Sequence, residues 1–113
     1  MQIALGNVTP NSTTVAQKAT VNMTGTQATY LPCEALQFQA LATNTNSVYI
    51  CQKANPSLTA DVHVEIPAPG SNPATRPAWT VGNPVGPNNL NAADYFVLPV
   101  VSGEGVRITA LQT

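Results

Sequence analysis

The sequence predicts an all-β domain, a small antiparallel β-sandwich of jelly-roll-like type with six to seven short strands and little or no helix. Three observations predict it. Apolar and polar residues alternate in several short stretches, and Gly, Pro and Asn separate these stretches. No stretch sustains the i, i+3, i+4, i+7 spacing of an amphipathic helix. With 113 residues, the chain has the length of one domain.

The stretch 30–54 is expected to form a central hairpin, because two alternating segments flank a short polar run there. Residues 43–47 are small and polar, as a hairpin loop requires. The residues expected on one face are Leu36, Phe38, Ala40 and Ala42 in the first limb, and Val48 and Ile50 in the second. We expect the other strands to be added to this pair.

The rest of the chain divides into an arm, a sandwich domain and a long loop. Residues 1–12 lack a regular pattern and predict an extended N-terminal arm, and residues 13–113 predict a single β-sandwich domain. Residues 67–92 are rich in Pro, Gly and Asn, which predicts an ordered surface excursion. The other expected strands are 13–24, 58–66, a short one at 78–81 around Trp79, 93–101 and 106–111.

The composition excludes some classes of partner. Charged residues make up 8% of the chain and the net charge is -1, so the chain lacks the basic surface that binds a phosphate backbone. No stretch approaches the roughly eighteen apolar residues of a membrane span, and the N-terminus lacks the pattern of a signal peptide. We therefore expect no nucleic acid and no membrane among the partners, and a protein used without secretion.

The two cysteines, Cys33 and Cys51, are expected to be reduced. In the predicted hairpin they lie about six residues out of register, roughly 20 Å apart, whereas a disulfide needs Cα atoms within about 7 Å. Two cysteines and one histidine also fall short of the four ligands of a structural zinc site. A disulfide and a zinc site are therefore both disfavoured.

One cluster has residue types suited to chemistry. Asp61, His63 and Glu65 alternate with apolar residues, so in a strand they project to one face and could hold a metal ion. The alternative, which we favour, is a solvated strand face. No nucleophile or phosphate-binding motif accompanies them. We expect no enzyme activity, no catalytic residues, no cofactor and no bound metal.

Trp79 is the single tryptophan and lies in the proline-rich segment. Together with a tyrosine it could form a platform on which a sugar ring stacks. The alternative, which we favour, is that its side chain pins the loop to the sandwich.

Several short motifs resemble those of small structural proteins of tailed-bacteriophage virions. They are Leu31-Pro32-Cys33, Leu36 to Ala40, Asn44-Thr45-Asn46, Val48-Tyr49-Ile50, Asn89-Leu90-Asn91 and Tyr95-Phe96. The resemblance implies a β-sandwich of about a hundred residues that serves on the particle, as a capsid decoration or cement protein or at a head or tail attachment.

The resemblance leads to an expected function, site and location. We expect a decoration or cement protein that binds the major capsid protein or a neighbouring virion protein, is located in the virion after assembly in the host bacterial cytoplasm, and forms a dimer or trimer. The alternative is a receptor- or glycan-binding accessory module of the head or tail. The expected interface consists of Ile3, Leu5 and Val8 in the arm and Pro69, Trp79, Pro84, Asn89 and Asn91 in the loop.

Overall fold

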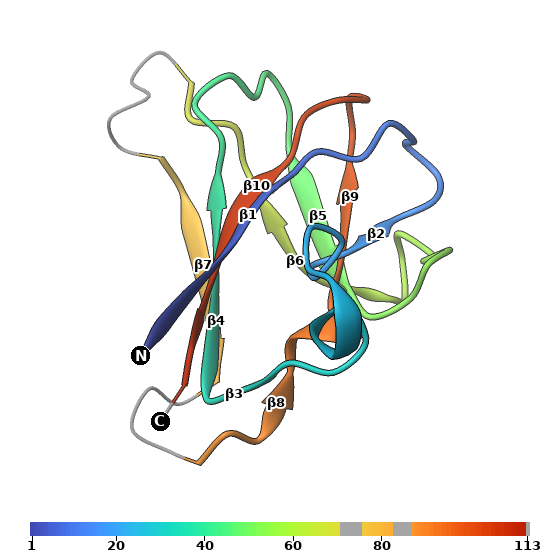
Figure 1. Ribbon diagram of the computed structural model, residues 1–113. Helices are drawn as coiled ribbons and strands as arrows, with labels where there is room; N and C mark the ends of the chain where they lie inside the picture. Colours follow the sequence, from blue (N-terminus) through green and yellow to red (C-terminus); the bar gives the residue numbers. More distant parts are fainter. Residues whose placement is uncertain (71–75, 83–86, 113) are drawn as a thin grey trace.

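The computed structural model describes residues 1–70, 76–82 and 87–112 and contains two four-stranded antiparallel sheets packed face to face (Figure 1). The first sheet has the order β1 (Gln2–Val8), β10 (Val106–Leu111), β4 (Ala35–Ala40) and β7 (Ala78–Gly82). The second has the order β2 (Gln17–Lys18), β9 (Phe96–Pro99), β5 (Val48–Cys51) and β6 (Val62–Ile66). A separate two-stranded sheet pairs β3 (Pro32–Cys33) with β8 (Leu90–Asn91).

This strand order is that of a jelly roll. Each main sheet interleaves strands from the two halves of the chain, as two Greek keys do. In the described residues, seven strands have four residues or more and the helical segments are the 3₁₀ turns Gly25–Ala28 and Ala92–Asp94. The predicted all-β sandwich with little or no helix is therefore confirmed.

The core lies between the two main sheets. Leu36, Phe38 and Ala40 of β4 project from one sheet, and Val48 and Ile50 of β5 project from the other; all five are fully buried. The period-two patterns thus identify these five buried positions correctly. Ala42, which was expected on the same face, lies beyond the end of β4 and is exposed, so that part of the prediction is wrong. The Phe38 ring packs on Trp79 of β7 and on Tyr95, at centroid distances of 5.8 and 6.0 Å.

The predicted central hairpin is wrong. β4 pairs with β10 and β7, whereas β5 pairs with β6 and β9, so the two limbs belong to opposite sheets. Residues 41–47, which include the polar run 43–47, cross from one sheet to the other. Alternation along two neighbouring segments is the same whether their apolar faces lie side by side in one sheet or face each other across a core, so it cannot distinguish the two arrangements.

The predicted N-terminal arm is also wrong. Residues 2–8 form β1, which pairs with β10 at the margin of the first sheet. The register shifts between Ala4 and Gly6, and Gly6 has a positive φ of 82°. Because this bulge adds one residue, Leu5 and Val8 both point into the core although they are three positions apart. The bulge interrupts strict alternation and so conceals the strand in the sequence.

Other boundaries differ in detail. The predicted strand 13–24 is mostly irregular; only Gln17–Lys18 is paired, and Val15 and Val21 are exposed. The segment 67–92 is more than a surface excursion, because it contains β7, an outer strand of the first sheet. β7 corresponds to the short strand that was predicted around Trp79.

Both cysteines are free, as predicted, and both are buried. Cys33 lies in β3 and Cys51 in β5, and burial raises the pKa of Cys33 to about 11 and the pKa of Cys51 above its usual value. A thiol with a raised pKa is a poor nucleophile at neutral pH. The two cysteines therefore serve as small core residues.

At one end of the sandwich, the loop 41–47 is held against the turn that precedes β10. The buried Asn44 side chain donates to the Gly105 carbonyl at 2.7 Å and accepts from the Gly105 N–H at 3.2 Å. The Glu104 carboxylate accepts hydrogen bonds from the amide and hydroxyl of Thr45, at 2.8 and 2.7 Å, and from the amide of Asn46. These contacts position the crossing between the sheets.

Glu104 makes the stability of this loop pH-dependent. Partial burial raises the pKa of its carboxyl, but the hydrogen bonds from Thr45 and Asn46 outweigh that effect and the pKa lies below its usual value. A depressed folded-state pKa gives stability that is present above the unfolded pKa, about 4.3, and is lost as the pH falls through the folded value. We expect Glu104→Gln to cost about 1 kcal/mol at pH 7 and less at pH 3.

Urea unfolding at pH 7 and pH 3 measures this difference. Glu65→Gln is the control, because Glu65 is exposed and no described contact joins its carboxylate to another group. If Glu104→Gln lowers the free energy of unfolding by the same amount at pH 7 and at pH 3, a role for the ionised carboxylate is contradicted.

Candidate functional site

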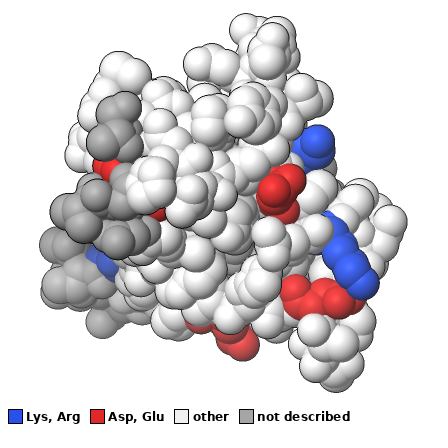
Figure 2. Space-filling model, turned by 90° about the horizontal axis from the view of Figure 1, so that it is seen from below, with Lys and Arg blue, Asp and Glu red and all other residues white. Residues whose placement is uncertain are grey.

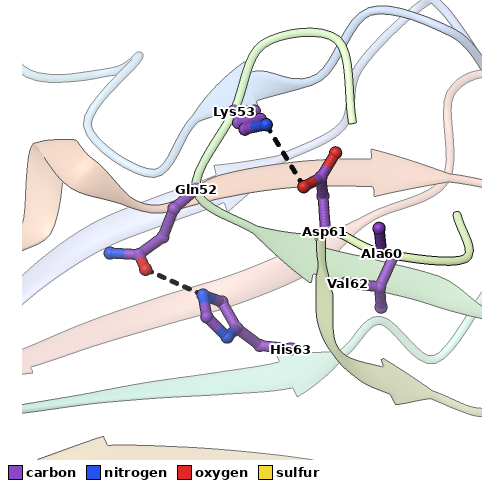
Figure 3. Close-up of a pocket in the computed structure, with 6 residues that line it drawn as sticks. All are labelled: Gln52, Lys53, Ala60, Asp61, Val62 and His63. Carbon is purple, nitrogen blue, oxygen red and sulfur yellow. Dashed lines mark hydrogen bonds and ion pairs between the residues drawn. The ribbon is translucent and has the colours of Figure 1, made fainter. Parts of the chain in front are cut away.

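A shallow surface pocket of about 250 Å³ lies beside the loop that joins β5 to β6 (Figure 3). Its lining residues are Gln52, Lys53, Ala60, Asp61, Val62 and His63. The loop folds back over the second sheet, where the Ala54 carbonyl accepts a hydrogen bond of 2.8 Å from the Ala16 amide beside β2. The pocket is thus formed between this returning loop and the start of β6.

The polar groups of the pocket already have protein partners. Figure 3 shows the His63 ring directed at Gln52, with 2.8 Å between Nε2 and Oε1, and the Asp61 carboxylate directed at Lys53, at 3.3 Å. Asp61 also accepts a hydrogen bond of 2.8 Å from the Ser57 amide. That bond, followed by the contact with Lys53, lowers the pKa of the Asp61 carboxyl. These interactions hold the loop in place.

Asp61, His63 and Glu65 do not form one cluster. Asp61 lies before β6, and the pairing of β6 with β5 shifts register at His63. Glu65 lies further along β6, opposite Tyr49 of β5. Within the described residues, no three His, Cys, Asp or Glu side chains lie close enough to hold a metal ion. The bulge turns the His63 side chain towards Gln52, which alternation alone could not predict.

The interface residues predicted in the arm lie in the fold itself. Leu5 and Val8 are 1% and 0% exposed, and Ile3 packs partly buried against the same core. In the folded chain, Leu5 and Val8 cannot touch a partner. Their prediction as interface residues is wrong, because β1 belongs to the first sheet.

The residues predicted in the loop are dispersed. Trp79 is half-buried and stacks on Phe38 with an interplanar angle of 28°, so it packs against the sandwich as the favoured alternative expects. Asn91 accepts hydrogen bonds from the amides of Leu31 and Ala93, and therefore holds the 3₁₀ turn before β9. Pro69 is half-buried, Asn89 is exposed, and Pro84 lies outside the described residues.

A surface that the sequence analysis did not predict covers the outside of the first sheet. We call it the polar face, and it is formed by side chains that alternate with the core residues of four strands. Arg107 stands opposite both Asn7 and Gln39, and Thr109 opposite Gln37, which in turn stands opposite Thr80. Its residues are Ala4, Asn7, Gln37, Gln39, Ala78, Thr80, Arg107 and Thr109.

The polar face carries amide, hydroxyl and methyl groups and a single charge, that of Arg107. On the face of the molecule seen from below, Figure 2 likewise shows few charged side chains among wide uncharged areas. The polar positions of residues 35–40 and 106–111 are the sequence signal for it, but the pairing of β10 between β1 and β4 is needed to bring them together.

The strand order defines the chain as a small all-β jelly-roll domain. Comparison with protein-family models, curated proteins and solved structures finds no match to this chain. In the part of the chain that the structure describes, no helix has the length and hydropathy needed to cross a membrane.

Proposed function

We propose that the chain is a structural protein of a tailed-bacteriophage virion that decorates or cements the capsid by binding the major capsid protein. The motif resemblance between residues 31 and 96 supports this proposal. The jelly-roll topology also supports it, because this architecture is common among viral capsid proteins. The main support is the polar face, an outer sheet surface of amides and hydroxyls with the single charge of Arg107.

Because Leu5 and Val8 are buried, we place the proposed contact with the capsid on the polar face instead. A face of amides and hydroxyls can form many hydrogen bonds with another protein surface while desolvating only one charge, that of Arg107. Each copy can bind weakly, since multivalent attachment to a symmetric lattice strengthens the whole layer. The protein then acts by mechanical reinforcement of the capsid.

Binding of the purified protein to expanded capsids that lack it tests the proposal. We expect the wild-type protein to bind them and to raise their melting temperature. Gln37→Glu adds a negative charge to the polar face and is expected to weaken binding at least about tenfold, because burying an unpaired charge costs several kcal/mol. Asn55→Glu adds the same charge to the exposed loop between β5 and β6 and is expected to bind normally. Absence of wild-type binding would refute the proposal.

The alternative function, binding of a receptor or glycan, has less support. Jelly rolls also include lectins, but the Trp79 ring stacks on Phe38 and is half-buried, which limits the ring surface that a sugar could cover. A glycan-array signal that Trp79→Leu abolishes, together with no capsid binding, would favour the alternative over the capsid role.

A further inference from the structure

The outer strands of the two main sheets differ in how their open edges are protected. An open edge presents unpaired main-chain groups that another strand can bind, and proteins block it with bulges, charges or short strands. β1 has a bulge, and the Asn22 side chain donates to the carbonyls of Leu5 and Asn7 at 3.3 and 2.8 Å. β2 is two residues long, and β6 combines a register shift with exposed His63 and Glu65.

β7 has none of these protections. Its sequence, Ala-Trp-Thr-Val-Gly, carries no charge, and it pairs with β4 without a register shift. Within the described residues it has no second strand partner, and Figure 1 shows it at the outer margin of its sheet. Ala78, Thr80 and Gly82 are exposed along it. As far as residues 1–70, 76–82 and 87–112 show, β7 is therefore the outer strand that is open to another strand.

The alternation of hydrogen-bonded pairs between β7 and β4 determines which main-chain groups of β7 point away from β4. The Ala40 amide donates to the Pro77 carbonyl at 2.8 Å, so this facing pair is a hydrogen-bonded one. Hydrogen-bonded and non-hydrogen-bonded pairs alternate along an antiparallel ladder. Trp79 and Val81 therefore direct their main-chain groups to β4, and Thr80 directs its N–H and C=O outwards.

The outer edge of β7 is complementary to itself. If two β7 strands lie antiparallel about a two-fold axis at Thr80, each Thr80 exchanges main-chain hydrogen bonds with the Thr80 of the other copy. Ala78 then faces Gly82, a pair of small residues, and Trp79 faces Val81. Aromatic with β-branched pairs and Thr with Thr pairs are both favourable across strands, and no charges oppose each other.

From these observations we propose that β7 is a dimerisation edge, at which a second copy of this chain adds its own β7 to form one continuous eight-stranded sheet. A two-fold contact places the same patch on both copies, as the self-complementary pairing around Thr80 requires. This inference is independent of the proposed capsid role, since a monomer can decorate a capsid and a dimer can serve another function.

Thr80→Pro tests the dimer, with sedimentation equilibrium over a range of concentrations as the measurement. Proline removes the outward N–H of Thr80, which the ladder with β4 does not use, so the sandwich is retained and far-UV circular dichroism can verify this. We expect a wild-type dimer whose dissociation constant rises at least about tenfold in the variant, since two symmetry-related hydrogen bonds are lost. A wild-type protein that stays monomeric up to about 1 mM would overturn the proposal.

Two lysine variants separate the edge from the adjoining polar face. In Thr80→Lys, the two introduced charges face each other across the two-fold axis and are expected to weaken the dimer. Thr109→Lys places the same charge in the same cross-strand row, but two strands inside the sheet. We expect Thr109→Lys to dimerise normally. Equal weakening by both variants would locate the contact on the polar face and overturn the edge proposal, as would dimers that neither Thr80 variant weakens.

Discussion

Gly105→Ala is expected to lose about 3 kcal/mol of unfolding free energy or more, equivalent to a fall of about 12 °C in Tm. A Cβ at this position would overlap the carbonyl oxygen of Val8 and lie 2.8 Å from its carbonyl carbon. Both groups are main chain and cannot rotate away. Movement of Gly105 would also break its two hydrogen bonds with the buried Asn44 side chain, which would leave polar groups unpaired in the core.

Gly103→Ala is the matched control for that variant. Gly103 has a φ of 88° but no atom within 4 Å of the position of a Cβ, so alanine there suffers backbone strain without a clash. Such strain costs about 1 to 2 kcal/mol. Urea unfolding of both variants compares the two effects, and a Gly105→Ala protein as stable as Gly103→Ala would show that β1 and the turn do not pack as closely as described.

Phe38→Ala is expected to cost about 3 to 5 kcal/mol, because removal of a fully buried ring leaves a cavity between the sheets. The ring joins Trp79 on the outer strand to Tyr95 beside the second sheet, so its loss also loosens β7. Trp79 is the single tryptophan, and its fluorescence should shift to longer wavelength as water gains access to it.

Phe96→Ala is the control for that variant, since Phe96 is the only other phenylalanine and is half-buried in the smaller apolar cluster outside the second sheet. We expect Phe96→Ala to lose less stability and to leave the tryptophan emission unchanged. Thermal unfolding followed by fluorescence measures both effects. An equal loss in the two variants would place less of the stability in the inter-sheet core than the burial of Phe38 implies.

The sequence by itself determined the class of the fold and many of its buried positions. Alternation placed Leu36 and Phe38, and Val48 and Ile50, in the core, because period-two patterning depends only on which side of a strand faces away from water. The final strand, residues 106–111, was predicted with the bounds that β10 has. Local patterns suffice for such features, since each residue reports its own burial.

Only the tertiary structure decided which strands pair and which surfaces remain free. β1 and β10 come from opposite ends of the chain and pair with each other. The bulge between Ala4 and Gly6 breaks the alternation that would have revealed β1 in the sequence. The polar face and the open edge at Thr80 exist only once β10 lies between β1 and β4, with β7 outermost. Strand pairing joins segments far apart in the chain, so local sequence patterns do not encode it.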